Sequence, residues 1–100
     1  MTIKLVKHPP NGAELLLEGK LEMTNAASVQ DAILKMVPEY RELELNFANL
    51  LFVSSAGLRA LMTIQKQVNR SGGTLTISHV SKPVMEVLEM TGFNSFLNIV

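Results

Sequence analysis

Apolar and polar residues repeat with two different periods along this chain, and each period predicts one kind of element. Three segments alternate with a period of two, which is typical of strands, and three segments repeat at spacings of three and four, which is typical of helices. A further segment, residues 14–18, contains the run Leu15-Leu16-Leu17, which predicts a strand buried on both faces. The predicted strands cover residues 2–7, 14–18, 43–47 and 74–78, and the predicted helices cover 26–37, 55–69 and about 81–92. Pro38 and Gly92 mark the ends of the first and third helices.

The order of these elements predicts a topology. Strands one and two are separated only by a short turn at residues 9–12, so we expect an antiparallel hairpin. Strands two, three and four are joined by helices, which predicts parallel pairing with right-handed crossovers. An apolar tail, residues 93–99, is expected to pack back on the sheet. The chain of 100 residues is thus predicted to be one α/β domain, residues 1–100, with a mixed four-stranded sheet packed by about three to four helices.

The most unusual segment lies between the third strand and the second helix. It begins with three large apolar residues, Leu50, Leu51 and Phe52, in what the pattern indicates to be a loop. Apolar loop residues of this size are unusual unless a partner covers them, so we expect one exposed docking patch formed by this loop and the start of the helix.

Two serines follow, Ser54 and Ser55, where the loop becomes a helix. Serine often caps a helix there, and this is the simplest interpretation of the pair. The same position also suits a phosphate, because the first backbone N–H groups and the helix dipole favour an anion. Gly57 lies in the first helical turn, where glycine costs about 1 kcal/mol relative to alanine. We interpret Gly57 as a position that lets another group approach the backbone closely.

The residues Ser54-Ser55-Ala56-Gly57-Leu58 resemble the signature of the STAS family, the fold of bacterial anti-sigma factor antagonists. That signature is Asp-Ser-Ser-Gly-Leu or a close variant after an apolar loop. The segments 17–21, 72–75, 80–84 and 87–93 are similar to the rest of the family in order and spacing, so the resemblance covers nearly the whole chain.

The resemblance implies that Ser55 is the residue phosphorylated by a partner kinase. Ser54 stands where the family usually has aspartate, which makes it a second candidate acceptor. The implied partner-binding residues are Leu50, Leu51, Phe52, Ser54, Ser55, Gly57, Leu58 and Arg59. Arg59 follows Ser55 by four residues and shares its helix face, so it is either a partner for a phosphate or an ordinary solvated arginine.

By the same resemblance, the unphosphorylated protein binds an anti-sigma factor that is also a serine kinase, and a sigma factor is released. Phosphorylation switches this binding off, and a serine phosphatase resets it. The alternative is a constitutive STAS subunit of a membrane transport complex, as in lipid-transport ABC systems, which docks its partner without phosphorylation.

Composition narrows the remaining function classes. Nine basic and nine acidic residues give zero net charge, which leaves no electrostatic footprint for nucleic acid. The chain has no cysteine, which excludes disulfides and thiolate metal sites, and His8 and His79 lack acidic or histidine neighbours in the sequence. We find no catalytic constellation and expect neither an enzyme nor a cofactor or metal. Without a signal peptide or an apolar run long enough for membrane insertion, we expect a cytoplasmic protein.

Overall fold

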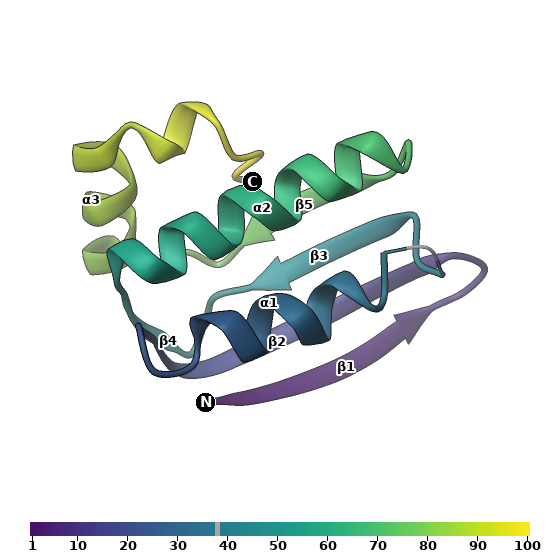
Figure 1. Ribbon diagram of the computed structural model, residues 1–100, viewed down its shortest axis with the longest axis horizontal. Coiled ribbons are helices and arrows are strands. Elements are labelled where there is room, and N and C mark those ends of the chain that lie inside the picture. Colours follow the sequence, from purple (N-terminus) through teal and green to yellow (C-terminus); the bar gives the residue numbers. More distant parts are fainter. Residues whose placement is uncertain (38) are drawn as a thin grey trace.

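A computed structural model of the chain describes residues 1–37 and 39–100 (Figure 1). The α/β class and the three predicted helices are confirmed, but the sheet has five strands instead of four. The elements are β1 (Thr2–His8), β2 (Gly12–Leu21), α1 (Ala26–Leu34), β3 (Glu42–Asn46), β4 (Leu50–Val53), α2 (Ser55–Arg70), β5 (Thr74–Ser78), α3 (Lys82–Thr91) and the 3₁₀ turn η1 (Phe93–Ser95). α1 ends earlier than predicted, at Leu34, and the predicted stop at Pro38 lies outside the described residues.

The sheet is mixed, with strand order β1-β2-β3-β5. β1 and β2 form the predicted antiparallel hairpin, and β2, β3 and β5 are parallel, as their helical connections require. The first half of β2, Gly12–Leu16, pairs with β3, whereas its end, Gly19–Leu21, pairs with β4. The register shifts between Gly19 and Lys20, and Gly19 has a φ of 110°, which favours glycine. One long strand therefore supports both β3 and β4.

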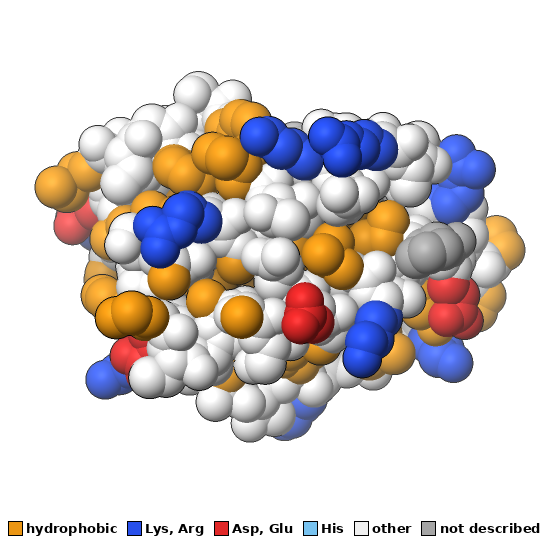
Figure 2. Space-filling model, viewed as in Figure 1, with side chains coloured by type: hydrophobic (Ala, Val, Ile, Leu, Met, Phe, Trp, Pro, Cys, Tyr) orange, Lys and Arg blue, Asp and Glu red, His pale blue; other side chains and the backbone are white. Residues whose placement is uncertain are grey.

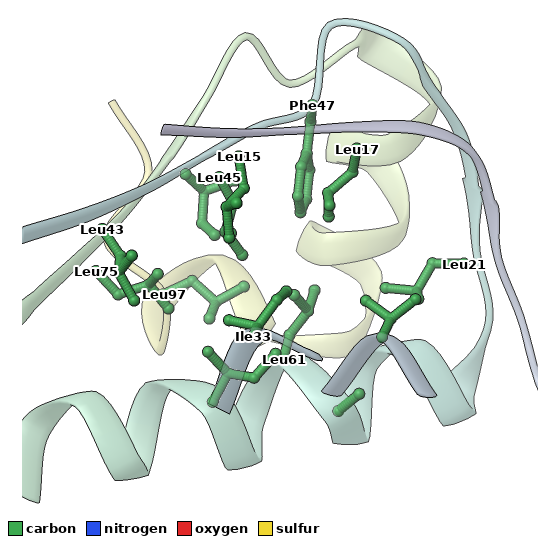
Figure 3. Close-up of a cluster of buried hydrophobic side chains, with 14 of the residues drawn as sticks. Leu15, Leu17, Leu21, Ile33, Leu43, Leu45, Phe47, Leu61, Leu75 and Leu97 are labelled. Carbon is green, nitrogen blue, oxygen red and sulfur yellow. The ribbon is translucent and has the colours of Figure 1, made fainter. Parts of the chain in front are cut away.

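The hydrophobic core lies between the sheet and the helices α1 and α2, which cover the same face (Figure 1). Figure 3 shows Leu15 and Leu45 of the strands, and Phe47 directly after β3, pointing towards Ile33 of α1 and Leu61 of α2. Each such side chain contributes about 1.5–3 kcal/mol when fully buried. The expected burial of β2 on both faces is only partly met, because Leu16 on the other face remains partly accessible.

The C-terminal tail returns to the sheet, as predicted. Gly92 ends α3 with a left-handed φ of 79°. Leu97 is buried, and Ile99 forms a parallel bridge with Ile77 of β5. Phe96, by contrast, stays substantially exposed. The tail thus covers the edge of β5.

Candidate functional site

The predicted apolar loop is a tight turn followed by strand β4. The side-chain Oδ1 of Asn46 accepts a hydrogen bond from the backbone N–H of Ala48 at 2.9 Å, and the N–H of Leu50 donates to the carbonyl of Phe47 at 3.0 Å. The N–H of Gly19 in β2 then donates to the carbonyl of Asn49 at 3.0 Å. These bonds hold the segment against the end of β2, so it is a strand instead of the loop we expected.

Strand pairing divides the apolar residues of β4 between the core and the surface. Leu50 and Val53 are buried, with 2% and 3% of their surface exposed, whereas Leu51 and Phe52 are 70% and 45% exposed. The expected exposure is therefore correct for Leu51 and Phe52 and wrong for Leu50. Two large apolar side chains remain on the surface, and only the buried Val53 separates them from the serine pair.

The two serines have different roles in the helix start. The N–H of Ser54 donates to the carbonyl of Leu21 at 2.9 Å, which continues the pairing of β4 with β2. The Oγ of Ser54 accepts a hydrogen bond from the N–H of Gly57 at 3.1 Å, so Ser54 is the N-cap of α2. Ser55 is the first helical residue and is exposed to solvent. Its hydroxyl is thus the more accessible of the two candidate acceptors.

Gly57 is buried, and the group that approaches its backbone belongs to this chain. A Cβ at this position would lie 2.8 Å from Cγ and 2.9 Å from the carbonyl oxygen of Leu21, both closer than van der Waals contact allows. The glycine therefore permits α2 to pack closely on the end of β2. Leu58, the next residue, is also buried. Gly57 and Leu58 are therefore not part of the exposed patch that we expected at the helix start, because the first turn of α2 faces the core on one side.

A further exposed apolar residue, Met23, lies in the turn after β2 and was not predicted from the sequence. This turn starts at Leu21, whose carbonyl binds Ser54, and Met23 is 82% exposed. The side chain of Asn25 holds the turn by accepting from the N–H of Glu22 at 3.0 Å and donating to the carbonyl of Lys20 at 2.8 Å. Apart from a methionine within a polar turn, the sequence contains no signal for this placement.

The exposed members of the predicted site are therefore Leu51, Phe52, Ser55 and Arg59. They come from the end of β4 and the first turns of α2. Arg59 follows Ser55 by one helical turn, on the same face of α2. We call Leu51, Phe52 and Ser55 the switch surface.

A separate polar group lies on the sheet face that α1 and α2 leave open. Nδ2 of Asn46 donates to a carboxylate oxygen of Glu14 at 2.9 Å, and this bond holds the pKa of Glu14 below its usual value. Nε2 of His8 lies 3.5 Å from the other oxygen of Glu14, so His8 has an acidic neighbour that its position in the sequence did not reveal. Across residues 1–37 and 39–100, no three His, Cys, Asp or Glu side chains are grouped to hold a metal ion.

A family model described as "Mlab, STAS domain" matches residues 5–100. The chain belongs to the STAS domain family. Residues of this STAS domain are 30% identical over 84 positions to the candidate anti-sigma factor antagonist BtrV of Bordetella bronchiseptica, covering 83% of this chain and 72% of BtrV.

Solved structures share the fold of this STAS domain. The phosphorylated form of the Bacillus cell fate determinant SpoIIAA matches 99% of this chain and 91% of its own, with a TM-score of 0.76 and 15% identity. A sulfate transporter family protein from Wolinella succinogenes matches 90% of this chain and 74% of its own, with a TM-score of 0.78 and 21% identity. In the part of the STAS domain that the structure describes, no helix is long and apolar enough to cross a bilayer.

Proposed function

We propose that this STAS domain is an anti-sigma factor antagonist that is active in its unphosphorylated form. In that form it binds an anti-sigma factor that is also a serine kinase, and transcription by the released sigma factor follows. The observation that carries this proposal is the exposed Ser55 at the start of α2, three residues after the exposed Phe52 of β4. Similarity to BtrV supports the same activity. We place this partnership in the cytoplasm, where transcription occurs.

We propose Ser55, and not Ser54, as the phosphoacceptor. The Ser54 hydroxyl already caps α2, and losing such a cap costs about 1 kcal/mol. Ser55 is accessible at the helix N-terminus, where the helix dipole favours a phosphate. Arg59, one turn further along the same face, is positioned to pair with this phosphate. Phosphorylation at Ser55 is therefore compatible with the folded helix.

The phosphate would act on binding instead of on folding. It adds about −1.5 to −2 charges beside the apolar Leu51 and Phe52. An unfavourable coupling free energy of about 1–3 kcal/mol between the phosphate and the partner would lower the affinity of the complex about 5- to 150-fold. A serine phosphatase that removes the group would restore binding. The domain itself then functions as a binding protein and performs no catalysis.

The test is phosphorylation in vitro. The purified domain would be incubated with ATP and the serine-kinase anti-sigma factor encoded nearest to it in the genome, and the product mapped by mass spectrometry. We expect phosphate on Ser55 in the parent and in Ser54→Ala, and none in Ser55→Ala. Phosphate found only on Ser54, or on neither serine, would refute the assignment.

A second candidate function is a constitutive subunit of a membrane transport complex. It is favoured by Ser54, which stands where the family usually has aspartate, and by the shared fold of the Wolinella succinogenes sulfate transporter family protein. In this case the switch surface would dock a transporter subunit without phosphorylation. Stable association with such a subunit that is unchanged in Ser55→Asp would favour this function over the first.

A further inference from the structure

The outward face of α2 carries positive charges and no negative one. α2 contains three cationic residues, Arg59, Lys66 and Arg70, and no acidic residue, and all three are exposed. At about 100° per residue they fall within one narrow arc of the helix, together with Ser55 and the half-buried Met62. We call these five residues the basic stripe. From Ser55 to Arg70 it extends about 22 Å.

The charges of the basic stripe are not neutralised by ion pairs on their own helix. Among the described residues the ion pairs are Lys4–Glu18 and His8–Glu14, and both lie on the sheet. The adjacent helix α1 contributes one exposed acid, Asp31, and its C-cap residue is an exposed base, Lys35. Figure 2 shows Lys and Arg side chains gathered along the upper part of this face, where Figure 1 places α2, and few acidic ones.

The chain has zero net charge, but its positive and negative charges are unevenly distributed over the surface. Because the whole chain is neutral, the excess of cations on α2 is matched by an excess of acids elsewhere. Four of the nine acidic residues lie on β2 and β3, namely Glu14, Glu18, Glu42 and Glu44. A partner approaching α2 meets a positive surface, and one approaching the open face of the sheet meets a negative one.

We propose that the basic stripe docks an acidic surface of the anti-sigma factor kinase, beyond the switch surface at its N-terminal end. This inference rests on the proposed function. The exposed Leu51 and Phe52 would supply the apolar centre of the interface, while the cations set the approach rate and the orientation of the partner. A protein fits better than a nucleic acid, because three cations with adjacent apolar residues are few for a phosphate backbone.

The basic stripe also accounts for the direction of the switch. Ser55 lies on the same arc of the helix as Arg59 and Lys66. A phosphate of about −1.5 to −2 charges offsets a large part of the three positive charges and faces an acidic partner with a like charge. Phosphorylation then weakens an acidic partner's binding, whereas it would strengthen the binding of a basic one.

The test measures association rates of the domain with the serine-kinase anti-sigma factor encoded nearest to it, without ATP, at about 50 mM and about 500 mM NaCl. Raising the salt concentration over this range shortens the electrostatic screening length. It is longer than the spacing between charges on the interface at the lower concentration and shorter than that spacing at the higher one. Lys66→Glu reverses one charge of the basic stripe. Lys7→Glu makes the same change at an exposed lysine of β1, the strand at the far edge of the sheet, and is the matched control.

We expect the parent's association rate to fall about tenfold over this salt range, and Lys66→Glu to lower the rate at low salt about three- to tenfold. Lys7→Glu should stay within about twofold of the parent. Circular dichroism checks folding, and Arg70→Glu is the second variant should Lys66→Glu fail to fold.

The outcomes separate this inference from the proposed function. If the parent binds, and Lys66→Glu associates as fast as Lys7→Glu, the inference is overturned and the proposed function stands. Faster association of Lys66→Glu would indicate a basic partner and also overturn it. Absence of binding by the parent would overturn both. Binding of labelled duplex DNA that Lys66→Glu abolishes would assign the stripe to nucleic acid and overturn the inference.

Discussion

Substituting Gly57 tests how closely α2 must pack on the end of β2. In Gly57→Ala, the new methyl carbon would lie 2.8 Å from Cγ and 2.9 Å from the carbonyl oxygen of Leu21. The Leu21 side chain is fully buried, so it has little room to move. Its carbonyl is also fixed, because it accepts the N–H of Ser54. The helix must therefore shift outward to admit the methyl group.

The net effect follows from two opposing contributions. Forcing an extra methyl group into a packed core typically costs about 1–3 kcal/mol. Alanine regains about 1 kcal/mol over glycine within a helix. We expect the overpacking to win, because backbone as well as side chain must move, and a net loss of about 1–2 kcal/mol. For a domain of this size the melting temperature should fall by about 4–15 °C.

Thermal unfolding followed by circular dichroism measures this loss. Ser55→Ala is the matched control, since it alters an exposed side chain in the same helical turn and should change the melting temperature by only a few degrees at most. A Gly57→Ala protein that melts at or above the parent's temperature would refute the packing argument and return Gly57 to a role in partner binding.

Four further outcomes follow from the same structure. Ser55→Asp should weaken binding of the kinase at least several-fold by calorimetry while its melting temperature holds or rises, since an acidic residue suits a helix N-terminus; unchanged affinity both for this variant and for the phosphorylated protein would exclude the switch. Ser54→Ala should lower the unfolding free energy by about 1 kcal/mol in urea titration, because the bond to the helix N–H is lost, and an unchanged midpoint would contradict the cap. His79→Gly should raise stability by about 1 kcal/mol, because His79 has a left-handed φ of 56°; a loss would show that its side chain stabilises the fold. Glu14→Gln should make the unfolding free energy fall less steeply as the pH is lowered. The hydrogen bond from Asn46 lowers the pKa of the Glu14 carboxyl, so this group stabilises the fold above its unfolded pKa and loses that contribution as pH falls through the folded pKa. Equal slopes of unfolding free energy against pH in the two proteins would contradict this.

Much of the fold was predictable because helices and strands each produce a characteristic spacing of apolar residues along the sequence. Four strands, three helices and the parallel arrangement of β2, β3 and β5 follow from spacing and from the order of elements. β4 escaped prediction because Leu50–Val53 is a continuous apolar run without alternation. Its pairing also depends on the irregular register at Gly19, which is distant in the sequence.

The candidate site, like the fold, was predicted from the sequence only in part. Sequence alone placed the serine pair at a helix start, and the family resemblance pointed to Ser55. The sequence does not show which of the two serines caps the helix, because either hydroxyl can accept a hydrogen bond from a nearby backbone N–H. The bond between Ser54 and Gly57, and the accessibility of Ser55, depend on how β4 delivers the chain into α2.

Exposure is what only the tertiary structure decided. The sequence determined that Leu50, Leu51 and Phe52 are apolar, but the pairing of β4 with β2 buries the first and exposes the other two. The sequence shows a glycine at position 57. The reason that a glycine is needed there is the close contact with Leu21, which lies far from Gly57 in the chain. Periodicity is a property of neighbouring residues, while burial and close approach depend on which distant elements pack together, so the first can be predicted from sequence and the second requires the fold.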